Sequence, residues 1–250
     1  MKIFFSEASP DYSSYTFPYA VYCLQENQNE MSAIYERGFL PYSDPQVLVS
    51  KEGIYYYLAR SVRVNLSHFS LTSENRRVRR KMDVLNPTME ILAKEDLIHD
   101  ADFWSFCEDY AAKRIGEEMP PARLRYIFER EILNRIFKFS SGNRILGYVW
   151  SPSNDEILHY WFAFFDTELM HAGIGKWMME QVISYAQTNG FRYVYLGTCY
   201  GTKPMYKIRD FKGIEYFDGN LWRTDLSFLK SKCKETGVFI DDFKRFPERF

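Results

Sequence analysis

The chain has 250 residues, of which 46% are hydrophobic and 26% charged, and its formal net charge at pH 7 is −1. These values are typical of a folded protein with a substantial core, and they exclude attraction to nucleic acid through overall charge. The sequence has no run of 18 apolar residues, no clear signal peptide and no CxxC pair among its four cysteines. It therefore predicts a cytoplasmic protein with reduced thiols and no metal site.

The elements expected in the first half are short and separated by polar turns. They are a helix near Glu30–Arg37 ended by Gly38, a strand within 53–66, a basic helix capped by Ser73, a helical stretch over 91–116 split at Asp100 or Asp102, and a helix from Pro120 through Arg135. A domain boundary is expected near Asp83–Pro87, which divides the chain into an N-terminal region, 1–84, and a second domain, 85–250.

The second half reads as a sheet with helices between its strands. Three consecutive antiparallel strands are expected at RIFKF, RILGYVW and EILHYWFAFF. A helix over 173–189, a buried strand at YVYLG, a short helix over 203–210, two closing strands at GIEYF and LWRT, and a helix over 225–235 follow. The pattern predicts a mixed α/β fold, with a mostly antiparallel central sheet, flanking helices and an N-terminal strand and helix region.

A glycine turn opens the helix at 173. Helix N-termini present N–H groups without acceptors and a positive dipole end, which suit a phosphate. The stretch Met170–Gly175 resembles the Q/R-x-x-G-x-G/A turn of acetyl-CoA enzymes of the GNAT superfamily: it keeps Gly173 and Gly175 but has Met170 at the Gln/Arg position. The alternative is a plain tight turn.

Three further features carry candidate chemistry. Tyr206 follows the YVYLG strand on a short helix, where a phenol can protonate a leaving group, and Lys207 beside it can hold a phosphate; the alternative for Tyr206 is a packed aromatic. The strand HYWFAFFD is expected beside YVYLG, where backbone N–H groups can polarise an acyl carbonyl. Asp166 ends this strand and is a candidate ligand for an amine, or a loop-start cap.

The basic helix is the fourth feature. On a helix Arg76, Arg79 and Arg80 share one face, and Arg77 and Lys81 share another. Such faces bind phosphates without reading sequence. The alternative is a solvated helix, salt-bridged to some of the 33 acidic residues.

Several segments in order resemble the aminoacyl-tRNA–protein transferases, the arginyl- and leucyl-transferases that modify protein N-termini. YERGFLPYS, SVRVNLSHFSLTSENRRVRRK, HYWFAFFD, GIGKWMMEQVI, YVYLG and MYK are similar to that family's motifs, across roughly 35–215. Ala59 and Tyr56 stand where family members carry cysteines, so no metal, iron–sulfur or haem cofactor is expected. Pro204 replaces a family lysine, so donor and acceptor specificity are expected to differ.

The resemblance implies a GNAT-like fold and transfer of an aminoacyl group from charged tRNA to the N-terminal amine of a protein. It implies three sets of site residues: a catalytic set of Tyr206, Asp166 and Tyr160; a donor-binding set of Gly173, Gly175, Lys176, Lys207, Phe162 and Phe164; and a tRNA-binding set of Arg63, Arg76, Arg77, Arg79 and Arg80. Two alternatives stay open: an acetyl-CoA-dependent N-acetyltransferase, and a non-catalytic GNAT-like module that binds RNA or protein.

Overall fold

The computed structural model describes residues 1–7, 19–43 and 53–234. The described residues divide into two compact units: the first comprises 1–7, 19–43, 53–63, 196–209 and 214–234, and the second comprises 64–195 and 210–213. Strands β5 (Ser61–Asn65) and β11 (Tyr193–Thr198) each begin in one unit and end in the other. The boundary expected near Asp83–Pro87 lies inside the second unit.

The first unit is built on an antiparallel sheet in the order β1-β2-β4-β3. Its strands are β1 (Lys2–Glu7), β2 (Tyr19–Gln25), β3 (Phe39–Pro41) and β4 (Ile54–Leu58). Helix α1 (Met31–Glu36) ends just before Gly38, whose φ of +83° and whose contact with Phe217 leave no room for a Cβ. The hairpin β12 (Ile214–Phe217) and β13 (Trp222–Arg223) and the helices α6 (Tyr206–Arg209) and α7 (Leu226–Lys232) complete this unit.

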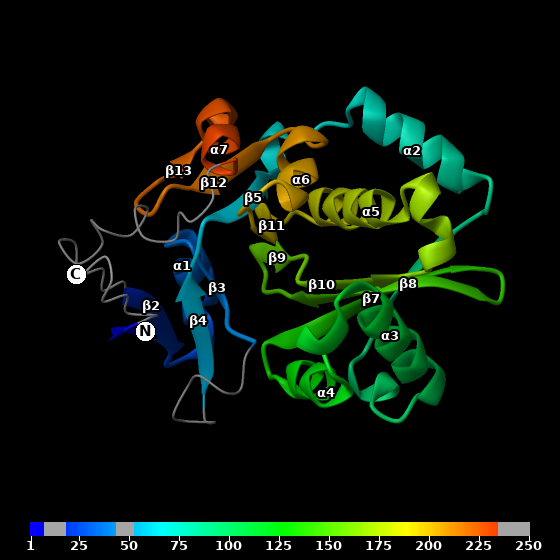
Figure 1. Ribbon diagram of the computed structural model, residues 1–250, viewed down its shortest axis with the longest axis horizontal. Helices are drawn as coiled ribbons and strands as arrows, with labels where there is room; N and C mark the ends of the chain where they lie inside the picture. Colours follow the sequence, from blue (N-terminus) through cyan, green and yellow to red (C-terminus); the bar gives the residue numbers. More distant parts are fainter. Residues whose placement is uncertain (8–18, 44–52, 235–250) are drawn as a thin grey trace. The chain divides into compact units, whose positions relative to one another are not determined.

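The second unit is built on a four-stranded antiparallel sheet in the order β10-β8-β7-β6. Its strands are β6 (Thr88–Leu92), β7 (Leu133–Ser141), β8 (Arg144–Pro152) and β10 (Phe162–Phe165), while β9 (Ile157–His159) pairs in parallel with β11. Helices α3 (Ala101–Arg114) and α4 (Pro121–Glu129) lie on one face of the sheet, and α5 (Ile174–Thr188) lies on the other (Figure 1). Helix α2 (Ser73–Asp83) packs against α5.

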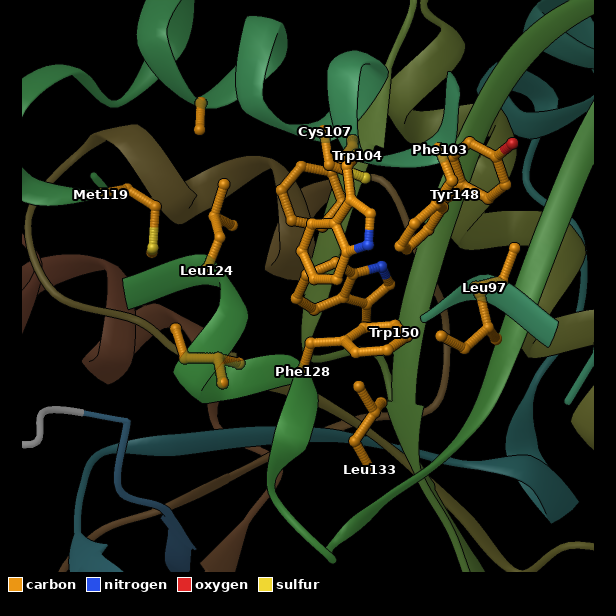
Figure 2. Packing of buried hydrophobic residues seen from close by; sticks show 14 residues of the cluster. Leu97, Phe103, Trp104, Cys107, Met119, Leu124, Phe128, Leu133, Tyr148 and Trp150 are labelled. Carbon is orange, nitrogen blue, oxygen red and sulfur yellow. The ribbon is translucent and has the colours of Figure 1, made fainter. Parts of the chain in front are cut away.

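The core between the sheet and helices α3 and α4 is strongly aromatic. Trp150 of β8 is fully buried at its centre, and Figure 2 shows it beside Trp104 and Phe128. Its ring centroid lies 5.2 Å from that of Phe128 and 4.7 Å from that of Phe164. Part of the high aromatic content therefore fills the core instead of forming a surface for stacking bases.

The predicted mixed α/β fold is confirmed, with local differences. The helix expected from Pro120 through Arg135 ends at Glu129, and Arg135 lies on strand β7, whose pairing with β8 replaces the helical hydrogen bonds. The stretch 88–92 is a strand paired with β7, not the start of a helix, because its register with β7 overrides the helical spacing that begins at Ile91. The strand expected over 53–66 is two strands, β4 and β5. Thr72, not Ser73, caps the basic helix, with Asn75 completing a capping box. Within the described residues, no helix has the length and apolar character needed to cross a membrane.

Candidate functional site

The glycine turn lies at the start of α5. Gly173 adopts φ +89°, a left-handed conformation that favours glycine, and a Cβ on Gly175 would lie 3.1 Å from the Phe165 ring. The amides of Lys176 and Trp177 both donate to the Gly173 carbonyl. The amides of Ile174 and Gly175, in the first turn, have no acceptor inside the helix. This turn therefore presents N–H groups and the positive end of a 15-residue helix.

The strand before this turn changes partner halfway along. Its first part, β9, pairs with β11, and the last bond of this ladder runs from the Tyr160 amide to the Tyr195 carbonyl at 2.8 Å. The next amide, that of Trp161, donates to the Trp150 carbonyl of β8 at 3.2 Å. The chain therefore leaves β11 at Tyr160 and joins the neighbouring sheet as β10, whose other edge pairs with no strand in the described chain.

The open edge of β10 offers backbone donors. The Asp166 amide donates to the Leu146 carbonyl of β8 at 2.9 Å. Successive amides of a strand point to opposite sides. The amides of Phe164 and Phe162 therefore point toward β8, as the Asp166 amide does, and those of Ala163 and Phe165 point toward the open edge. The donors for an acyl carbonyl are expected among the amides of this strand. The Tyr160 and Trp161 amides are already bonded, and the first amide after them that points toward the open edge is that of Ala163.

The aromatic side chains predicted along this strand have different exposures. Phe164 is 1% exposed and belongs to the core cluster, so its ring cannot contact a donor, while Phe162 is half-buried. Tyr160 is buried, with 7% of its surface exposed.

Lys176, predicted near donor phosphates, pairs with two carboxylates. Its Nζ lies 2.8 Å from an Asp210 oxygen and 3.2 Å from a Glu74 oxygen. Glu74 also binds Arg77, and the Arg77 hydrogen bond is the main reason that the pKa of Glu74 falls to about 2. The ammonium of Lys176 is therefore largely neutralised by its neighbours.

The basic helix α2 retains an exposed cationic face. Arg79 is bound by Glu180, a carboxylate 2% exposed on α5, and Arg77 is paired with Glu74 but stays half-exposed. Arg76 donates to the Leu71 carbonyl through Nη1 and is exposed. We call the exposed basic residues of this helix the cationic face; they are Arg76, Arg77, Arg80 and Lys81.

Asp166 caps the turn that leads to α5. Its carboxylate accepts from the Glu168 amide at 2.9 Å and binds the Arg144 guanidinium at 2.9 Å. This is the capping arrangement given above as the alternative, and an amine at this carboxylate would compete with Arg144.

Three predicted residues belong to the first unit. Arg63 is 3% exposed, is bound by Glu36 and Glu215, and has its guanidinium 3.9 Å from the Trp222 ring centre, so no surface remains for an RNA phosphate. Tyr206 begins α6 and is half-buried. Lys207 donates to the Thr198 carbonyl at 3.3 Å, and burial lowers its pKa to about 8. The catalytic role of Tyr206 and the donor role of Lys207 stay predictions.

Two residues that the sequence did not indicate shape the second-unit site. Asp210 and Glu180 are almost fully buried acids, and each binds one of the basic residues that had been expected to contact the donor or RNA. Glu180 also accepts from Ser184 at 2.6 Å, four residues along the helix, which is the one local signal in the sequence that it is a satisfied buried acid.

A strand that parts from a parallel neighbour and runs into a glycine-started helix is the arrangement of a GNAT-type acyltransferase. Residues 76–212, more than half of the chain, match the family model of the acetyltransferase (GNAT) domain, and the chain belongs to this family. No curated protein matches the sequence significantly.

Solved structures with a similar fold have low sequence identity. The C-terminal domain of a putative lysylphosphatidylglycerol synthetase from Agrobacterium fabrum is 10% identical at a TM-score of 0.45, and the match covers 71% of this chain and 54% of that one. The structure of L-PGS from Bacillus licheniformis is 8% identical at 0.46, covering 84% and 70%. FemX is 9% identical at 0.38, covering 68% and 60%. The chain thus spans about half the length of the first of these.

Proposed function

We propose that this GNAT-type protein transfers an aminoacyl group from charged tRNA to the N-terminal amine of a protein. The observation that carries the proposal is the cationic face of α2, which stays exposed although Arg79 is bound to a carboxylate of α5. A nucleotide donor as small as coenzyme A needs few charges, whereas a row of basic residues suits a phosphodiester backbone.

Helix α2, which carries this face, lies beside the glycine turn. A Cβ on Gly173 would lie 3.3 Å from the Val78 side chain of α2, so the helix lies directly against the turn. Arg76 and Arg80, like Arg77 and Lys81, are four residues apart and therefore neighbours on the helix surface. The backbone of a tRNA acceptor end would lie along these residues, with its terminal phosphates near the start of α5.

The chemistry follows from the open edge of β10. The amine nitrogen attacks the ester carbonyl carbon, a C–N bond forms, and the carbonyl oxygen becomes negatively charged while the Ala163 N–H donates to it. The C–O bond to the terminal ribose then breaks, and the ribose oxygen takes up a proton as the amine loses one. Tyr206, which the sequence suggests as the proton donor, belongs to the first unit, and its role stays a prediction. Because the ester is already activated, much of the rate would come from holding the two reactants together.

Binding of tRNA tests the proposal with a matched pair of variants. Arg80→Glu/Lys81→Glu changes the last turn of α2, and Lys113→Glu/Arg114→Glu makes the same charge change in the exposed last turn of α3. The first should reduce the slope of log affinity against log salt by about 1 to 2, because roughly one counterion is released per phosphate contact, and the second should leave it unchanged. Equal effects of the two, or no binding of tRNA by the unmodified protein, would contradict the proposal.

Turnover is then measured by transfer of a labelled amino acid from charged tRNA to a peptide. A peptide with an acetylated N-terminus is the control and should accept no label. Salt-dependent binding of tRNA without any transfer would instead support a non-catalytic module.

The second candidate is acetyl transfer from acetyl-CoA to an amine. The family match and the two glycines at the start of α5 favour it, because both accord with a pyrophosphate at this turn. Binding of coenzyme A, with an affinity that the Arg80/Lys81 variant leaves unchanged, would decide for this candidate.

A further inference from the structure

Two cysteines of the first unit lie in direct contact. The Sγ atoms of Cys199 and Cys233 are 3.5 Å apart, and the Cys233 thiol also lies 3.4 Å from the Cys199 carbonyl oxygen. Cys199 follows the end of β11, and Cys233 is the C-cap of α7, so 34 positions of sequence separate them. Their side chains are 0% and 1% exposed.

The other two cysteines are isolated from this pair and serve as internal references. Cys23 lies on β2 and Cys107 on α3, and both are buried free thiols. The Cys23 thiol donates to the Leu24 carbonyl oxygen, at 3.8 Å. Burial alone therefore does not distinguish the Cys199 and Cys233 thiols from the others; their contact does.

We propose that Cys199 and Cys233 are a modification site at which peroxide forms an intramolecular disulfide that ties α7 to the segment leading to α6. A disulfide needs its sulfurs about 2.05 Å apart, so the two atoms must approach by roughly 1.5 Å. Cys233 is the C-cap of a seven-residue helix and its amide donates to the Leu229 carbonyl at 2.9 Å, so the approach has to come from rotation of the two side chains and a small shift of the last turn.

The reaction balances with peroxide as the oxidant. One thiol loses its proton and its sulfur attacks peroxide, so that an S–O bond forms, the O–O bond breaks and water leaves. The second sulfur then attacks the resulting sulfenic acid, the S–S bond forms, the S–O bond breaks, and a second water carries away the hydroxyl group and the remaining proton. A small oxidant suits a pair with almost no exposed surface, and a second thiol in contact captures the sulfenic acid before further oxidation.

Burial protects the reduced pair from oxidation while the site stays closed. Burial raises the pKa of Cys199 to about 12, so its thiol is protonated at neutral pH and reacts only when the site opens. The reaction is therefore expected to be slow in the native state and to accelerate under conditions that loosen α7.

The link would act on the segment that carries Tyr206. The residues after Cys199 lead directly to α6, and Lys207 of that helix donates to the carbonyl of Thr198, immediately before Cys199. A disulfide at Cys199 therefore fixes one end of this segment to α7 and is expected to restrict its movement. This inference does not depend on the proposed function, because its readout is chemical.

The test treats the full-length reduced protein with hydrogen peroxide, denatures it and counts free thiols by alkylation and mass spectrometry. The expected result is a change from four alkylated cysteines to two, restored by dithiothreitol, with peptide mapping that joins Cys199 to Cys233. Cys23→Ala is the matched control and should still form the link, whereas Cys233→Ser should not. The proposal would be overturned by four free thiols after treatment, by a link through another cysteine, or by a link between two chains. If a variant fails to fold, the peptide map of the protein without substitutions decides.

Discussion

Lys176→Met separates two roles for a residue at the start of α5. The resemblance to aminoacyl-transferases implies that this lysine contacts the phosphates of the donor. In the structure its ammonium is held between Asp210 and Glu74. A structural role predicts a loss of stability, and a donor role predicts a loss of donor affinity.

The expected loss of stability follows from the burial of the two partners. Removing one member of a fully buried ion pair costs about 3–5 kcal/mol, and removing an exposed pair costs less than about 1 kcal/mol. The Lys176 side chain is 28% exposed and that of Asp210 only 5%, so the case is intermediate. We expect the free energy of unfolding to fall by about 2 kcal/mol, because the Asp210 carboxylate stays buried after its ammonium partner is lost.

Urea unfolding followed by tryptophan fluorescence measures this change, with Lys113→Met as the control. Lys113 is 63% exposed and lies 3.7 Å from Asp109, so its removal should change the unfolding free energy by less than about 0.5 kcal/mol. Donor binding is measured on the same two variants. If Lys176→Met left stability within 0.5 kcal/mol of the parent while weakening donor binding about tenfold, the structural argument would be wrong and the phosphate contact correct.

Three further predictions follow from the described contacts. Ala163→Pro removes the outward amide of β10; because an edge strand tolerates proline, the protein should fold while kcat falls about 100-fold or more. Ala163→Gly keeps the amide and should retain activity. An equal loss of activity in both variants would refute the role of that N–H. Glu74→Gln should lower the unfolding free energy by less than about 1 kcal/mol at pH 7, and the difference should vanish as the pH falls from about 4.5 to about 2, because the folded-state pKa of Glu74 lies below its ordinary value; a difference that persists in acid would contradict this. Trp150→Ala should lower the free energy of unfolding by about 3–5 kcal/mol, measured by heat or urea. Trp150→Phe should lower it less, because the buried indole N–H has no hydrogen-bond partner within the described residues. Equal losses in the two variants would contradict this.

The order of elements could be predicted from the sequence because most of it is written in local signals. Pro120 and Pro121 mark the start of α4, Gly38 ends α1, and the strands of the long hairpin show a continuous apolar and aromatic pattern. Strand β6 was missed for the opposite reason. Its side chains are mostly exposed or half-buried, and only pairing with β7 makes it a strand, so no local periodicity distinguishes it.

The candidate site was predictable to a smaller extent. The glycine turn and the neighbouring strand were found because backbone geometry there demands particular residues, as at Gly173. The switch of partner at Tyr160 was not, since hydrogen-bond exchange between two sheets depends on which carbonyls lie nearby and leaves no residue pattern. The sequence therefore predicted this strand but could not say which of its amides points outward.

The basic helix shows why charge in a sequence is a poor measure of charge available to a ligand. Five basic residues fall within six positions, yet Arg79 is bound to an acid 101 positions away in the chain, while Arg80, beside it, is exposed. The two differ by one residue, which is a rotation of about 100° on the helix, and that rotation turns one of them toward α5 and the other toward solvent. Once α2 packs against α5, its amphipathic pattern selects which arginines a polyanion can reach. The charge reversal at Arg80 and Lys81 is therefore a sharper test of RNA binding than one at Arg79, whose loss would disturb the fold first.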